Sequence, residues 1–114
     1  MRLNRMGWMA LLAAAALFGN DTVRLSEAEA KKAIVSKVDP QYPQMARQMH
    51  LTGRVVVDVY IDEDGSVDKV QTLNGNALLT SAAANAVKRW KFTPFTSGGH
   101  PSKAVTSLAF DFRM

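Results

Sequence analysis

The chain has 114 residues, of which 47% are hydrophobic and 21% are charged, a composition typical of one small folded domain. It excludes a multidomain enzyme and a disordered charged tail, and the absence of cysteine excludes a disulfide scaffold, a thiolate metal site and a cysteine nucleophile. The formal net charge is +4, but removing residues 1–19 with Arg2 and Arg5 lowers it to +2, so the charge does not indicate a nucleic-acid partner.

The first 19 residues predict an export signal. Arg2 and Arg5 precede an uninterrupted apolar run over residues 6–18, which ends at Gly19. A helix of this length rises about 20 Å, whereas the hydrocarbon core of a bilayer is about 30 Å thick, so we expect no full membrane span. We predict a cleaved signal peptide at residues 1–19, with a short uncleaved anchor and an ordinary buried helix as the alternatives.

Residues 20–38 are expected to form a linker or N-terminal extension, and residues 39–114 one domain. In the extension, Ser26 and Glu29 fit a capping box that would start a short helix. Residues 34–38 predict a brief extended piece, because the following Pro40 disfavours helix at Asp39.

A two-turn helix is predicted to start at Pro43 and to end near Gly53. Met45 and Met49 lie on it, one turn apart. Such a pair could bind a soft metal, but we interpret it as core packing, because methionine fills irregular gaps in protein cores.

A β-hairpin follows. Residues 54–62 alternate between apolar and polar side chains, as in a half-buried strand, and residues 67–73 form a second strand. Asp64 and Gly65 between them are a strong signal for a tight turn. We therefore expect the two strands to pair antiparallel.

The principal helix is predicted over residues 77–91, where apolar residues recur three and four positions apart behind a possible cap at Asn76. Residues 104–112 alternate again and form the last strand. The predicted fold is α+β, with a three-stranded antiparallel sheet that carries two helices on one face.

The basic cluster at residues 88–91 surrounds Trp90 and could bind nucleic acid. We interpret it instead as a helix end with favourable cations and an aromatic anchor in the core.

No pattern indicates catalysis. An EF-hand loop starting at Asp62 would need glycine and glutamate where Val67 and Leu73 stand. His50 and His100, the only histidines, lack partners at metal-ligand spacing and are interpreted as surface or turn residues. We predict no enzyme activity, catalytic residue, metal site or cofactor; a small hydrolase or metal protein built on the histidines and the acidic turn is the alternative.

The last strand is the remaining candidate site. A strand at the end of a chain often lies at a sheet edge, where unpaired backbone groups can accept an extended segment of another protein. The alternative is an edge that merely closes the domain.

An ordered set of short motifs carries a family resemblance. It comprises Pro40-Gln41-Tyr42-Pro43, Ala46, Gly53-Arg54-Val55, Val57, Ile61, Asp64-Gly65, Val67, Ala82 to Ala86, Trp90-Lys91-Phe92 with Pro94, Gly99 with Pro101, and Phe110-Asp111-Phe112. Together these residues resemble the carboxy-terminal domain of the TonB family, over about residues 34–114. Each motif would be weak alone, so the order of the set is what makes the resemblance specific.

The resemblance implies a periplasmic module that binds outer-membrane TonB-dependent receptors by β-strand addition and is linked to energy-dependent transmembrane transport. It also implies the partner-binding residues, which are Asp39, Gln41, Tyr42, Pro43, Ala104, Val105, Thr106, Ser107, Leu108, Ala109 and Phe110. The strand residues would contribute mainly backbone groups. The family often has glutamine where Asp39 stands.

Two features of TonB transducers are missing from this sequence. TonB transducers usually carry a membrane helix with a histidine and a long proline-rich spacer, but here no histidine precedes His50 and no proline precedes Pro40. We therefore expect the binding domain alone, exported to the periplasm, with a membrane contact only through an uncleaved N-terminal segment. Its partners would be these receptors or other envelope proteins; the alternative function is a structural envelope module that self-associates, for instance as a homodimer, without a role in transport.

Overall fold

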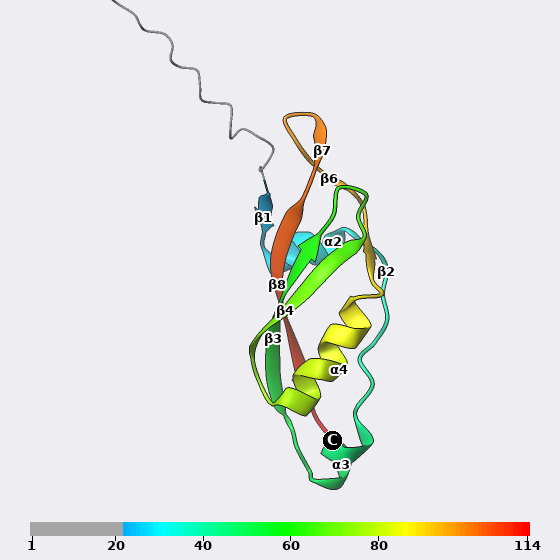
Figure 1. Ribbon diagram of the computed structural model, residues 1–114, viewed down its shortest axis with the longest axis vertical. Helices are drawn as coiled ribbons and strands as arrows, with labels where there is room; N and C mark the ends of the chain where they lie inside the picture. Colours follow the sequence, from blue (N-terminus) through cyan, green and yellow to red (C-terminus); the bar gives the residue numbers. More distant parts are fainter. Residues whose placement is uncertain (1–21) are drawn as a thin grey trace, which may run out of the picture.

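The computed structural model describes residues 22–114, so the predicted signal peptide lies outside the described part. Eleven elements follow in chain order (Figure 1): β1 (Val23–Leu25), α2 (Glu27–Lys32), β2 (Ile34–Ser36), α3 (Gln44–Gln48), β3 (Gly53–Ile61), β4 (Val67–Asn74), α4 (Ala77–Val87), β5 (Lys91–Phe92), β6 (Phe95–Ser97), β7 (His100–Ser102) and β8 (Ala104–Phe112). The α+β class is confirmed.

The main sheet has four strands in the order β1-β8-β3-β4. β3 pairs antiparallel with β8 over nine residues, from Gly53 opposite Phe112 to Ile61 opposite Ala104. β4 pairs antiparallel with β3, and β1 pairs parallel with β8. The prediction of a three-stranded antiparallel sheet is therefore wrong, because residues of the N-terminal extension add a fourth, parallel strand.

The predicted hairpin between β3 and β4 is confirmed, and a buried glycine closes its turn. The Gly65 N–H donates to the Asp62 carbonyl at 2.9 Å, and the Asp62 N–H donates to the Ser66 carbonyl at 2.8 Å. The Asp64 carboxylate accepts the Ser66 hydroxyl at 2.6 Å and the Ser66 N–H at 2.9 Å, and these bonds lower the pKa of Asp64. The Gly65 carbonyl accepts the Phe92 N–H at 2.9 Å, which attaches the turn to β5.

Over residues 22–114, three helices and not the predicted two pack on one face of the main sheet, and alternate residues of β3 line the core beneath them. One cluster joins α2 and the end of α4 to the sheet through Ala30, Val57, Val59, Ile61, Val87, Trp90, Phe92, Ala104 and Leu108. The other joins α3 and the start of α4 through Ala46, Val55, Leu79, Ala83 and Phe112. Both predicted helix caps form: Ser26 and Glu29 make the capping box of α2, and the Asn76 side chain accepts the Leu78 N–H at 2.9 Å.

Two details of the predicted helices are wrong. α4 ends at Val87, and Lys91 begins a strand that pairs with β2, so this segment satisfies its backbone groups in a ladder instead of a helix. Met45 and Met49 do not pack in the core: their exposed fractions are 59% and 58%. The short helix α3 buries Ala46 instead, whose small side chain allows the helix to approach the sheet closely.

Trp90 is the core anchor that the sequence predicts. It is 5% exposed, and its indole N–H donates to the Val38 carbonyl at 2.7 Å. Its ring also meets Phe110 edge to face, with centroids 5.9 Å apart. Trp90 therefore ties the segment before Pro40 to the last strand.

Candidate partner-binding edge

The backbone of β8 alternates between its two neighbours. In an antiparallel pair, every second residue directs its N–H and C=O groups away from the partner strand. The Lys103 carbonyl accepts the Val23 N–H at 2.8 Å, and the Ala109 N–H donates to the Glu27 carboxylate at 3.2 Å, so both groups point away from β3. By the same alternation, the backbone groups of Val105, Ser107 and Asp111 face the side on which a further strand could add.

The predicted strand residues divide accordingly. The side chains of Ala104, Thr106 and Leu108 are buried on the helix side of the sheet, and their backbone groups bond to β3. Val105, Ser107 and Ala109 supply the outer row. Of the strand segment that the resemblance implies, only this second set offers backbone groups to a partner.

The expectation that the last strand lies at a sheet edge is wrong for its first part, because β1 is the outer strand there. β1 lies beside the first part of β8, with Val23, Arg24 and Leu25 opposite Ala104, Val105 and Thr106 (Figure 1). Within residues 22–114, no strand pairs with this side of β8 beyond Thr106. Sequence reasoning missed this contact; the alternation of Val23 and Leu25 before the capping box was the available signal.

Tyr42 connects the other predicted segment to the end of β8. Its hydroxyl donates to the Leu51 carbonyl, and its ring packs edge to face on Phe112, with centroids 5.5 Å apart. The Arg47 guanidinium lies 5.1 Å from the centre of the Tyr42 ring. Pro43 is the N-cap residue immediately before α3 and has an extended backbone conformation.

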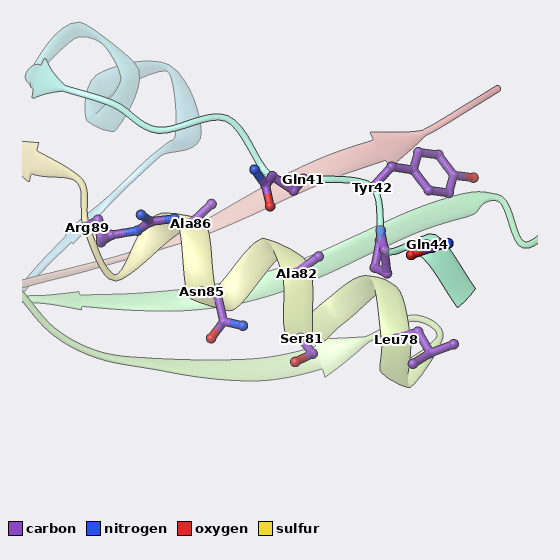
Figure 2. Close-up of a pocket in the computed structure, with 10 residues that line it drawn as sticks. Gln41, Tyr42, Gln44, Leu78, Ser81, Ala82, Asn85, Ala86 and Arg89 are labelled. Atoms are coloured by element: carbon purple, nitrogen blue, oxygen red, sulfur yellow. The ribbon is translucent and has the colours of Figure 1, made fainter. Parts of the chain in front are cut away.

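Two cavities flank this segment. One of about 190 Å³ lies between Pro40 and Tyr42 on one side and residues 110–113 on the other. The second, of about 580 Å³, lies between the segment and α4 (Figure 2). Figure 2 shows the lining residues Gln41 and Gln44 on the segment and Ser81, Asn85 and Arg89 on α4.

The structure thus joins the two predicted halves of the site at one end only. Tyr42 lies beside Phe110 and the C-terminal end of β8, whereas Gln41 and Pro43 line the cavity against α4. Asp39 and Gln41 are exposed. Residues 104–106 lie at the other end of the strand, beside β1 (Figure 1). The open part of the edge begins after Ala109.

The histidines and the basic cluster, which the sequence offered as alternative sites, form no metal-binding group within residues 22–114. His50 and His100 are exposed. Lys88, Arg89 and Lys91 are exposed around the buried Trp90. None of the helices over this same range is long and apolar enough to cross a membrane.

A sequence model of the family described as the Gram-negative bacterial TonB protein C-terminal matches residues 38–114. This chain belongs to the TonB C-terminal family. Protein TonB of Vibrio cholerae is 38% identical to it over 87 residues, which make up 74% of this chain and 36% of that protein. Protein TonB of Escherichia coli is 33% identical over 78 residues, 67% of this chain and 31% of that protein.

The fold agrees with the sequence relationship. The solution NMR structure of the Pseudomonas aeruginosa TonB C-terminal domain matches with a TM-score of 0.60 and 29% identity, over 71% of this chain and 84% of that one. The present chain spans about a third of the length of the curated TonB relatives it matches. The shared part is therefore the C-terminal domain of those proteins.

Proposed function

We propose that this TonB-family domain is a periplasmic, non-enzymatic module that binds outer-membrane TonB-dependent receptors or other envelope proteins. It would accept an extended segment of the partner as an added strand beside β8, as one step of energy-dependent transport. Family membership supports the class of partner. The observation that carries the binding mode is the outward row of β8 backbone groups, which ends beside the cavity between Pro40, Tyr42 and Phe110.

Each part of the proposed site has a distinct role. The outward backbone groups within residues 104–110, those of Val105, Ser107 and Ala109, would provide the ladder, which is independent of the partner's sequence. Gln41 and Asp39 carry exposed polar groups on the segment that holds Tyr42, and we propose that they select side chains of the partner. Tyr42 and Pro43 form the walls of the flanking cavities and would fix the direction in which the segment leaves the edge.

Photo-crosslinking in cells tests the proposal. A benzoylphenylalanine probe replaces Asp111, whose exposed side chain sits on the open part of β8, and a matched probe replaces Lys69 in β4 at the opposite edge of the sheet. We expect adducts with an outer-membrane barrel protein from position 111 and not from position 69. Adducts only with a second copy of this chain would favour the self-associating envelope module, and adducts from position 69 alone would refute the β8 edge.

A backbone substitution separates strand addition from side-chain contact. The Asp111 N–H faces away from β3, so Asp111→Pro removes an edge donor without breaking the ladder to β3. The control Asp111→Ala keeps that donor but removes the carboxylate, which lies 3.7 Å from Arg54. We expect proline, and not alanine, to reduce the yield of adducts from a probe at Gln41, with the circular dichroism spectrum unchanged.

The proposed location has its own measurement. Mass spectrometry of the purified protein reports its N-terminus, and fractionation reports its compartment. We expect a soluble periplasmic protein that starts after the predicted signal. An intact N-terminus in the membrane fraction would instead favour the uncleaved anchor.

A further inference from the structure

We propose that residues 22–32 form an internal cap on the β8 edge, which a partner strand must displace before it can pair along the whole edge. The proposal rests on the proposed function, because it concerns access to that same edge. The cap consists of β1 and α2, and it precedes residue 38, where the family match begins. It therefore lies outside the range that the family model matches.

The strand part of the cap imitates an added strand. β1 runs parallel to β8 and pairs Val23, Arg24 and Leu25 with residues 104–106. Its side chains alternate as a docked strand would: Val23 and Leu25 pack on the core cluster, while Arg24 is exposed on the opposite face. A partner that replaces β1 should therefore carry apolar side chains at two alternating positions.

In the helical part of the cap, the Glu27 side chain takes the place that a backbone carbonyl of an added strand would occupy. The Glu27 carboxylate accepts the Ala109 N–H at 3.2 Å, four residues along β8 from the centre of the β1 ladder. A carboxylate can only accept hydrogen bonds, as a strand carbonyl does. The capping box of Ser26 and Glu29 fixes the first turn of α2, and Lys31 lies 3.5 Å from Glu27, so the acceptor is held in place.

Together these contacts leave too little free edge for strand addition along residues 104–110. β1 pairs with the edge up to Thr106, and Glu27 takes the Ala109 N–H. Of the outward N–H groups that follow on β8, only that of Asp111 remains. A segment that pairs with the whole edge must therefore take the place of the cap.

The contacts also define where the cap can detach. The Ala33 carbonyl accepts the Thr93 N–H at 2.8 Å, and β2 pairs with β5 immediately afterwards. Residues from Ala33 onwards are thus tied to the domain independently of the cap. Before Ala33, the backbone ladder covers three residues, against nine between β3 and β8. The cap is the smaller unit and should open before the sheet does.

A disulfide provides a reversible lock, because the chain has no cysteine of its own. Arg24 and Val105 are direct partners on adjacent strands and lie on the same face, so R24C with V105C places two thiols within disulfide reach. The single variant R24C is the control. Glu27→Ala removes the acceptor of the Ala109 N–H, and Glu27→Gln keeps an acceptor oxygen while removing the charge.

The first readout needs no partner. Amide hydrogen exchange by NMR should show the outward N–H groups of Val105 and Ala109 exchanging faster than the inward N–H groups of Leu108 and Phe110. Oxidation of the R24C/V105C pair should slow exchange at position 105 by about tenfold or more, and reduction should restore it. If Val105 and Phe110 exchange at the same rate without the lock, the cap does not open separately and the proposal is overturned.

The second readout is crosslinking in cells from the probe at Asp111. We expect fewer adducts from the oxidised double variant than from R24C alone, and more from Glu27→Ala, with Glu27→Gln close to the unaltered chain. Equal adducts from locked and unlocked chains would overturn the cap and leave the proposed function standing. No adducts from any variant, although exchange shows opening, would refute the proposed function and with it the regulatory role of the cap.

Discussion

The substitution Gly65→Ala tests how tightly the hairpin turn packs against β5. Gly65 has a φ of +89°, and a Cβ at this position would lie 2.0 Å from the Phe92 carbonyl oxygen. That oxygen belongs to the backbone, so no side-chain rotation can relieve the contact. The turn and β5 must move apart by roughly 1 Å to restore van der Waals distance.

The cost has two parts. A left-handed backbone conformation costs a residue with a Cβ about 1 kcal/mol. Separation of the turn also breaks the bond from the Phe92 N–H to the Gly65 carbonyl, and a buried N–H left without a partner costs about 1–3 kcal/mol. We expect Gly65→Ala to lower the free energy of unfolding by about 3 kcal/mol, which is roughly 15 °C in Tm for a domain of this size.

A matched control isolates the contact from the backbone strain. Gly99 has a φ of +85°, but a Cβ there meets nothing within 4 Å. Gly99→Ala should therefore cost only the strain, about 1 kcal/mol. Urea denaturation of both variants, followed by circular dichroism, measures the difference. Equal losses of stability in the two variants would refute the reasoning that the turn is held against β5.

Three further changes probe the core, a helix cap and the turn. Thr106→Val should raise the free energy of unfolding by about 1 kcal/mol in thermal denaturation, because the buried Thr106 hydroxyl has no hydrogen-bond partner within residues 22–114; a loss would mean that it has one. Asn76→Ala should lower that free energy by about 1 kcal/mol in urea, since the Leu78 N–H loses its acceptor, and no change would exclude a role for the cap. Ser66→Ala should raise the pKa of Asp64 toward its ordinary value of 3.8, as followed by NMR titration. The lowered pKa of Asp64 stabilises the fold at neutral pH, and this contribution disappears as the pH falls through that pKa. The Ser66→Ala variant should therefore lose less stability than the unaltered chain below pH 3.8. The same loss of stability in both chains at acid pH would contradict the role given to the Ser66 hydroxyl.

Local patterns were sufficient for most elements of this fold. The alternation in β3, the Asp64-Gly65 turn and the two helix caps each depend on neighbours within a few residues, so their signals are complete in the sequence. The core position of Trp90 was predicted from the helical spacing of apolar residues, although the helix itself ends at Val87. The exposure of Met45 and Met49 could not be predicted in this way, because a helix of five residues can turn a small side chain such as Ala46 toward the sheet.

Which part of β8 is covered by the chain itself was decided by tertiary structure alone. The sequence indicated that β8 would lie at an edge, but in the sheet it lies between β1 and β3. The family resemblance implied a segment around Tyr42 beside it. Neither could show that Glu27 would meet Ala109, since 82 residues separate them. Three-residue strands such as β1 carry almost no periodic signal, and their pairing depends on which edge the completed sheet leaves open. The sequence therefore indicated the strand that we propose accepts a partner, and only the folded chain decided that its own N-terminal segment pairs with residues 104–106 of that strand and bonds to Ala109.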